Sequence, residues 1–171
     1  MWCLLIVGIM ALLNRFGKVF NWLAAGTAYI GIIGALVTIL GEPYLDSQEA
    51  WGSWYLIKSA VSHTILLLGC VYILAGKFVK IRVHGVIPTF VLGLVYGVIG
   101  FIDILIFAAI DHDTNPMYIK EPIKSGMEPL YGWMLLIISV VIVFIFTSVW
   151  ELCFYKKDER FYKNFHAEEL F

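Results

Sequence analysis

Four apolar stretches, each long enough to cross a bilayer as a helix, constrain what this chain can fold into. A helix needs about 20 apolar residues to span the roughly 30 Å hydrocarbon core of a membrane. Of the 171 residues, 61% are hydrophobic and 15% are charged, whereas a soluble domain has about 45–50% apolar and about 25% charged residues. We therefore predict an all-α, polytopic transmembrane helix bundle. Its full spans are expected at residues 19–40, 55–75, 86–110 and 131–150.

A fifth apolar segment, residues 1–13, is shorter than the others. As a helix it reaches about 20 Å, which is about 10 Å too short to cross the hydrocarbon core. It does not fit a signal peptide, because Arg15 and Lys18 follow the apolar run instead of preceding it. We expect either that the chain lacks upstream sequence or that neighbouring helices bury this segment. Residues 1–150 then form the bundle, and residues 151–171 form a cytoplasmic juxtamembrane tail.

The charged residues outside the spans predict the orientation of the chain. With 12 Lys and Arg against 13 Asp and Glu, the chain lacks the basic surplus that nucleic-acid binding requires. The links 41–54 and 111–130 are mainly acidic, and the other links and the tail are basic. Because cytoplasmic links are enriched in Lys and Arg, we predict an external amino terminus, a cytoplasmic carboxyl terminus and a location in the cell membrane. The basic links and tail contain Arg15, Lys18, Lys77, Lys80, Arg82, Lys156, Lys157, Arg160 and Lys163.

Few ionisable side chains lie inside the predicted spans, and these are the candidate functional residues. Lys58 and Asp103 are the only charged residues there, and His63 is the only histidine. Such groups are costly in a membrane and are functional candidates for that reason. Counting residues from the ends of the segments places Cys3, His63 and Asp103 at similar depths. The arrangement suggests Cys3 as a nucleophile, His63 as its general base and Asp103 as the residue that orients His63.

Other interpretations of the same residues remain open. His63 and Asp103 could form a single structural hydrogen bond or a proton or cation relay in a small transporter. Cys3 could be a small buried hydrophobe, since a thiol in apolar surroundings is unreactive. A helix-bundle scaffold without chemistry is a third possibility. We predict no cofactor or metal, because the consecutive residues Asp111, His112 and Asp113 cannot all converge on one ion from a helix.

Small residues on two spans predict close helix packing. Gly93, Gly97 and Gly100 precede Asp103 at a spacing that lets another helix approach, either within the chain or from an oligomeric partner. The series Thr27-x-x-x-Gly31-x-x-x-Ala35 offers a similar surface on the second segment. We expect membrane lipid to be the other partner of the bundle.

Several short motifs follow one another in a recognisable order. They are Trp2-Cys3-Leu4, Tyr29-Ile30-Gly31-Ile32-Ile33-Gly34-Ala35-Leu36 followed by Pro43, Ser62-His63-Thr64, and Asn115-Pro116-Met117-Tyr118-Ile119-Lys120-Glu121-Pro122.

This order resembles that of the YwaF-like family of bacterial integral membrane proteins. That family is related to a vertebrate transmembrane protein implicated in acyl transfer to ether phospholipids. The resemblance implies a bacterial plasma-membrane protein that acts on lipid, with Cys3 and His63 in its site. It also implies one or two further helices before residue 1 and a histidine two residues before the cysteine, where this chain has Met1.

Overall fold

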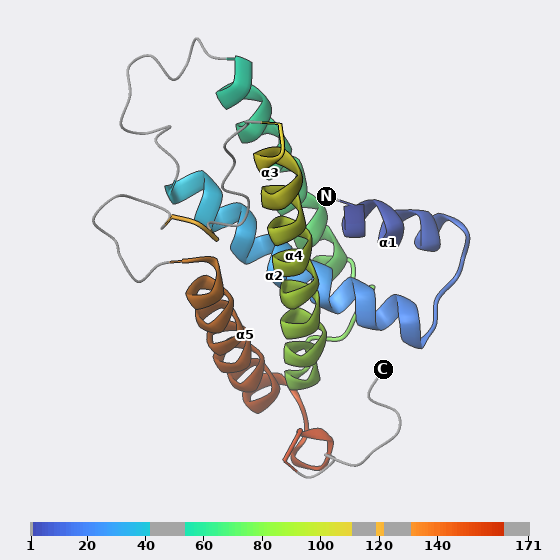
Figure 1. Ribbon diagram of the computed structural model, residues 1–171. Coiled ribbons are helices and arrows are strands. Elements are labelled where there is room, and N and C mark those ends of the chain that lie inside the picture. Colours follow the sequence, from blue (N-terminus) through green and yellow to red (C-terminus); the bar gives the residue numbers. More distant parts are fainter. Residues whose placement is uncertain (1, 42–53, 111–118, 122–130, 163–171) are drawn as a thin grey trace.

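The computed structural model describes residues 2–41, 54–110, 119–121 and 131–162 (Figure 1). Its described residues form helices and no strands, so the predicted all-α class with five helical segments is confirmed. The last helix continues beyond the predicted end at Trp150, because Glu151 is buried in the bundle and does not begin an exposed tail. The elements are α1 (Trp2–Leu12), α2 (Lys18–Gly41), α3 (Trp54–Ala75), the 3-10 turn η3 (Val83–Gly85), α4 (Val86–Ala108), α5 (Gly132–Phe154) and the 3-10 turn η5 (Lys157–Glu159).

Four of these helices, α2 to α5, are long and apolar enough to cross a membrane. The 24 residues of α2, for example, correspond to a length of about 36 Å. Large apolar side chains also remain exposed along the outer faces of α3, α4 and α5, which suits contact with hydrocarbon. The chain therefore has the character of a multi-pass integral membrane protein. The exposed apolar residues include Val61, Ile65, Leu68, Val95, Ile102 and Ile145.

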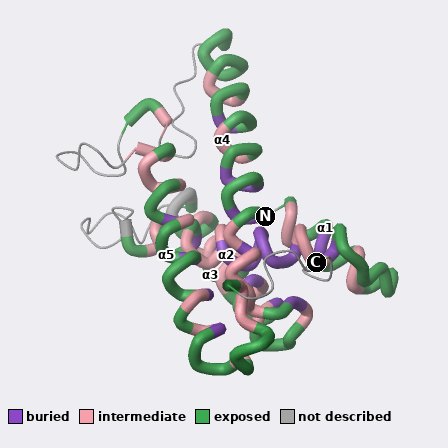
Figure 2. The backbone as a smooth tube through the Cα atoms, turned by 90° about the horizontal axis from the view of Figure 1, so that it is seen from below, coloured by how far each residue is buried: buried purple, intermediate pink, exposed green. Residues whose placement is uncertain are grey.

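Helix α2 lies at the centre of the bundle. In its membrane-length window 44% of the residues are buried, against 11–17% in the other three spans. α3 and α4 both pack against it, α1 contacts α2 and α3, and α5 packs mainly on α4. As a result α1 and α5 lie on opposite sides of α2 (Figure 1), and the buried residues gather around α2 while much of α4 and α5 is exposed (Figure 2).

Glycines allow α2 to approach its neighbours closely, as the small-residue pattern predicts. A Cβ atom added to Gly26 would lie 2.8 Å from the carbonyl oxygen of Pro88 on α4. A Cβ atom on Gly31 would meet the thiol of Cys70 on α3. These contacts are the expected form of helix association in a membrane, where close van der Waals packing is an important driving force.

The two ends of the bundle differ in the helix termini that they hold. We name as the acidic end the one at which α2 and α4 finish and α3 and α5 begin. We name as the basic end the one at which α3 and α5 finish and α2 and α4 begin. The acidic and basic links of the sequence lie at the corresponding ends. Which side of a membrane each end meets stays a prediction.

Helix α1 is the apolar segment that is too short to span. Its 11 residues correspond to about 17 Å. Val7 is buried, and Leu4, Met10 and Ala11 pack against the core, but Trp2 and the opposite face are exposed. The neighbouring helices therefore cover one side of α1 only.

Candidate functional site

Cys3 lies near the start of α1 and is partly buried. Tyr96 on α4 is a neighbour of Cys3. The side chain of the next residue, Leu4, packs against Gly69 on α3. These two contacts place Cys3 at the level of Tyr96 on α4 and of Gly69 and Cys70 on α3.

His63 is partly buried on α3 and is hydrogen-bonded within its own helix. Its Nδ1 atom lies 2.9 Å from the carbonyl oxygen of Ser59 and 3.3 Å from the Ser59 hydroxyl. A carbonyl oxygen only accepts hydrogen bonds, so Nδ1 is the nitrogen that carries the hydrogen. In the neutral ring Nε2 then keeps the lone pair, and it is the atom of His63 that can accept a proton.

Asp103 is partly buried on α4, two helical turns beyond Tyr96 in the sequence. Seven residues along a helix correspond to about 10 Å, and the six residues from His63 to Gly69 correspond to about 9 Å. Cys3 therefore lies about two turns nearer to the basic end than His63 and Asp103. The equal depth expected from residue counting does not hold, because α1 crosses the direction of α4 instead of running along it (Figure 1).

No hydrogen bond among the described residues joins Cys3, His63 and Asp103 to one another. The structure brings Cys3 to Tyr96 and His63 to Ser59. α3 and α4 each pack extensively on α2 and make little contact with each other. Direct proton transfer requires heavy atoms about 2.6–3.2 Å apart or one bridging water. The roles of these three residues therefore stay predictions, and their use as a triad requires movement of α1 along α3.

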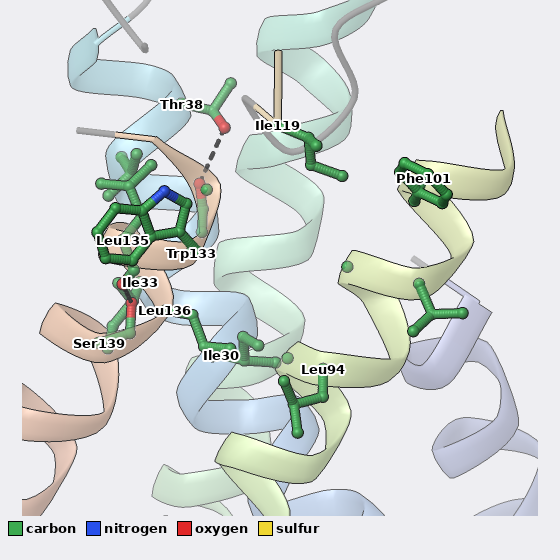
Figure 3. Close-up of a pocket in the computed structure, with 16 residues that line it drawn as sticks. Ile30, Ile33, Thr38, Leu94, Phe101, Ile119, Trp133, Leu135, Leu136 and Ser139 are labelled. Carbon is green, nitrogen blue, oxygen red and sulfur yellow. Dashed lines mark hydrogen bonds between the residues drawn. The ribbon is translucent and has the colours of Figure 1, made fainter. Parts of the chain in front are cut away.

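A different feature of the bundle is an apolar cavity between α2, α4 and α5. Its volume is about 440 Å³ (Figure 3). It extends over about eight residues of α2 and of α4, which corresponds to about 12 Å along each helix axis. It lies in the half of the bundle toward the acidic end. Its lining residues are Ile30, Ile33, Gly34, Val37, Thr38, Gly93, Leu94, Gly97, Val98, Phe101, Ile119, Gly132, Trp133, Leu135, Leu136 and Ser139.

The two hydroxyl groups in this lining are hydrogen-bonded to their own helices. Thr38 donates to the carbonyl oxygen of Gly34 at 2.9 Å, and Ser139 donates to the carbonyl oxygen of Leu135 at 2.7 Å. Figure 3 shows both bonds directed toward the helix backbone. These two hydroxyl groups therefore donate their hydrogens to the helix backbone and not to a ligand, and the cavity surface is mainly apolar.

Part of the cavity lining lies at the surface of the bundle. Four of its lining side chains are about half exposed: Leu94 (47%), Val98 (60%), Phe101 (54%) and Trp133 (59%). Two of its glycines, Gly34 and Gly97, face open space, since a Cβ atom on either would meet nothing within 4 Å. Gly93 is different, because a Cβ atom there would meet Leu136 of α5. Of the predicted glycine series, Gly93 and Gly100 are buried within this chain and Gly97 lines the cavity.

A polar cluster closes the basic end of the bundle, and we call it the clasp. At its centre Glu151 of α5 is fully buried. Its Oε1 atom accepts a hydrogen bond from the backbone N–H of Val83 at 2.8 Å, and its Oε2 atom accepts one from the N–H of Phe161 at 2.8 Å. Glu151 thus holds the start of η3 and the segment after α5 against the end of its own helix.

Two arginines complete the clasp. Arg82 donates to the carbonyl oxygen of Glu159 at 2.6 Å, and its guanidinium carbon lies 3.9 Å from the ring centroid of Tyr155. Arg160 donates to the carbonyl oxygens of Leu152 at 2.8 Å and of Tyr155 at 3.1 Å. The segment after α5 is therefore folded back on the basic end and differs from the simple tail that the sequence suggested.

Sequence reasoning missed Glu151 because it counted this residue with the solvated tail. A signal was present in the spacing. The buried residues of α5 are Ser139, Val143, Thr147 and Glu151, at intervals of four that place them on one helix face. Ser139 and Thr147 lie on one face of an otherwise apolar span and indicate the face that packs within the protein, and Glu151 continues that face four residues after Thr147.

Two sequence expectations concern residues outside the described part of the chain. These are the acidic link with Asp111, His112 and Asp113, for which no metal site is predicted, and most of the motif that runs from Asn115 to Pro122. Within the described part of the chain, no group of three or more His, Cys, Asp and Glu side chains is arranged to hold a metal ion.

Comparison of the chain with protein-family models, with curated proteins and with solved structures gave no match. The resemblance to YwaF-like proteins therefore stays a prediction from the motifs. By the length and composition of its helices, the chain is a helical protein of the multi-pass integral membrane class.

Proposed function

We propose that this integral membrane protein binds the acyl chain of a membrane lipid in the cavity between α2, α4 and α5. The observation that carries the proposal is the apolar lining of a cavity of about 440 Å³. Ligand pockets typically have volumes of about 300–1,000 Å³ and are mostly apolar. A ligand in this cavity gains packing contacts, and it has no need of polar partners along the chain.

The size of the cavity favours an acyl chain over a transmembrane helix of another protein. A helix with side chains is about 10 Å wide and rises 5.4 Å per turn, so one turn occupies roughly 400 Å³. The cavity therefore has room for about one turn, whereas a spanning helix has five or more. A thin chain entering from one end fits the space without displacing α4 or α5.

The position of the exposed lining residues supports entry from the lipid phase. The exposed lining residues Leu94, Val98 and Phe101 lie on α4, and Trp133 lies in the first turn of α5. Tryptophan is enriched where membrane proteins meet the interface. We infer that the acyl chain lies along α4 and that the lipid headgroup stays near Trp133 at the acidic end.

Filling the cavity tests the proposal. In vesicles containing a phospholipid with a photoactivatable group in its acyl chain, the unmodified protein should crosslink at lining residues of α4 and α5. Gly97→Leu should lower that crosslinking about tenfold, because losing about ten carbon–carbon contacts costs roughly 1–2 kcal/mol. The new side chain meets nothing within 4 Å at its Cβ atom, so the fold should persist.

The matched control is Gly8→Leu. Gly8 is also a helical glycine with nothing within 4 Å of an added Cβ atom, but it lies on α1 and outside the cavity. Its crosslinking pattern should equal that of the unmodified protein. Equal labelling of the Gly97→Leu variant, or labelling of the cavity lining no stronger than that of Val61 and Ile65 on α3, would contradict the proposal.

A second candidate function is acyl transfer through Cys3, which the hydrogen bond of His63 Nδ1 to Ser59 favours because it leaves the lone pair of the neutral ring on Nε2. In this proposal α1 moves along α3 until the thiol of Cys3 reaches Nε2 of His63. His63 then removes the thiol proton, and the thiolate of Cys3 attacks the carbonyl carbon of a lipid ester. A thioester forms, and the ester C–O bond breaks with return of the proton to the leaving oxygen. The hydroxyl group of a lysolipid then attacks the thioester, forms the new ester and releases the Cys3 thiol.

Cys3→Ala should reduce acyl transfer between phospholipid and lysophospholipid in vesicles to the uncatalysed rate, because it removes the nucleophile. Cys153→Ala is the control, since Cys153 is an exposed free thiol on α5. Full transfer by the Cys3→Ala variant would reject the mechanism. A proton relay would instead give vesicle proton flux that requires His63 and is insensitive to Cys3.

A further inference from the structure

The clasp and the cavity lie at opposite ends of the same pair of helices. α4 and α5 run antiparallel, and two contacts and the cavity lining mark their path. At the basic end Glu151 binds the N–H of Val83, just before α4 begins. At the cavity itself Leu136, in the second turn of α5, packs against Gly93 of α4. The lining continues from this contact toward the acidic end, with Gly97 on α4 and Trp133 on α5. Figure 1 shows α4 and α5 converging at the basic end and diverging toward the acidic end.

We propose that Glu151 is a positioning residue for the lipid site, a role that rests on the proposed function. By fixing the end of α5 to the start of η3 and to the segment after α5, Glu151 sets the angle between α4 and α5. That angle determines the width of the cavity near the acidic end. Along α5, Glu151 is therefore about 18 Å from Ser139, the nearest residue of the cavity lining on this helix, and about 28 Å from Gly132, the farthest.

A carboxylate is suited to this position because it has two acceptor oxygens and no hydrogen to donate. The two backbone N–H groups that it binds belong to segments 68 and 10 residues away in the sequence. Charge-assisted bonds of this kind are stronger than neutral ones. Glutamine keeps one acceptor oxygen but presents an NH₂ group to the second N–H. Glu151→Gln therefore removes one of the two hydrogen bonds and leaves the side-chain volume nearly constant.

A small rotation of α5 at the clasp produces a larger displacement of α5 at the cavity. The 23 residues of α5 have a length of about 35 Å. A rotation of about 5° around the clasp moves the other end of α5 by about 3 Å. A movement of this size is comparable to the width of an acyl chain, so the clasp controls whether the cavity walls hold the chain.

The first measurement is amide hydrogen exchange of the full chain in lipid nanodiscs. Glu151→Gln should accelerate exchange at Val83, at Phe161 or at both by about tenfold, because a charge-assisted hydrogen bond is lost. Glu159→Gln is the control, since Glu159 is an exposed acid of the same segment whose backbone carbonyl receives Arg82. The control should leave both rates unchanged.

The second measurement uses spin-labelled unnatural amino acids, which leave the three cysteines in place. One label pair, at Ile106 and Ile137, reports on the acidic end, and a second pair, at Ile87 and Val149, reports on the basic end. All four residues are exposed. Glu151→Gln should broaden the distance distribution of the acidic-end pair and shift its mean by about 2 Å, because Ile137 lies only about 21 Å along α5 from Glu151. Glu159→Gln should not change it.

Two results would overturn the inference. One is unchanged exchange at Val83 and Phe161 in the Glu151→Gln variant. The other is faster exchange with an unchanged acidic-end distance. If Glu151→Gln does not fold, Glu151→Asp takes its place, because the shorter carboxylate reaches only one of the two amides.

The same experiment separates this inference from the proposed function. If Gly97→Leu leaves lipid crosslinking intact while Glu151→Gln moves α4 relative to α5, the role of the clasp is supported and lipid binding in the cavity is rejected. If Gly97→Leu lowers crosslinking while Glu151→Gln leaves the distances unchanged, lipid binding is supported and the positioning role of Glu151 is rejected. If both stand, Glu151→Gln should also reduce crosslinking at the cavity lining.

Discussion

Replacement of Glu151 by alanine should destabilise the protein by about 2–6 kcal/mol. The change removes the acceptor of two backbone N–H groups, those of Val83 and Phe161. An unsatisfied buried donor costs about 1–3 kcal/mol, and Glu151 is fully buried. Thermal unfolding of the protein in detergent micelles, followed by circular dichroism, measures the effect as a lower apparent Tm.

Glu159→Ala is the matched control for this prediction. It removes an exposed carboxylate from the same part of the chain and leaves the backbone carbonyl that binds Arg82. Exposed substitutions usually change stability by about 0.5 kcal/mol or less. An apparent Tm of Glu151→Ala equal to that of Glu159→Ala would show that the clasp contributes no stability.

The helices themselves could be predicted from the sequence because their physical cause is local. Each span is a run of apolar residues whose length matches a membrane, and the charged links end it. The predicted end of the last helix, at Trp150, was wrong for a physical reason. An ionisable residue beside a span usually reaches water, but Glu151 is instead satisfied by amides from distant segments. Counting charges along the chain does not identify hydrogen-bond partners that are distant in the sequence.

The candidate site was harder to predict because it depends on the angles between helices. Counting residues gives depth only when helices run parallel to the same axis. α1 crosses that axis, so Cys3 lies beside Tyr96 and Gly69. His63 lies about two turns away and binds Ser59 of its own helix. The residue types were correctly recognised as unusual in a membrane, but their separation is a tertiary property.

The cavity illustrates the same limit with identical residues. The sequence pattern predicts that Gly93 and Gly97 both admit a neighbouring helix. Gly93 does contact Leu136, whereas Gly97 faces the cavity. The difference arises from the divergence of α5 from α4 toward the acidic end, and no spacing of glycines along one helix encodes it.

Two glycines on α2 should respond in opposite directions to the same substitution. At Gly26 an alanine Cβ atom would lie 2.8 Å from the carbonyl oxygen of Pro88 and 2.7 Å from a methyl group of Leu92. The obstacle is backbone as well as side chain, so α4 must move away from α2. Overpacking of this kind typically costs about 1–3 kcal/mol. At Gly34 an added Cβ atom meets nothing within 4 Å, and alanine is favoured over glycine in a helix by about 0.5–1 kcal/mol.

The apparent Tm of the two alanine variants in detergent micelles tests this expectation. Gly26→Ala should unfold at a lower temperature than the unmodified protein, and Gly34→Ala at the same or a higher temperature. Because the two sites share one helix and one substitution, differences in intrinsic helix propensity largely cancel between them. The remaining difference in Tm then reports on the packing of α2 against α4, the two helices that line one side of the cavity. Equal Tm values for the two variants would mean that α2 and α4 are not packed together at Gly26, and the cavity lined by both helices would lose its basis.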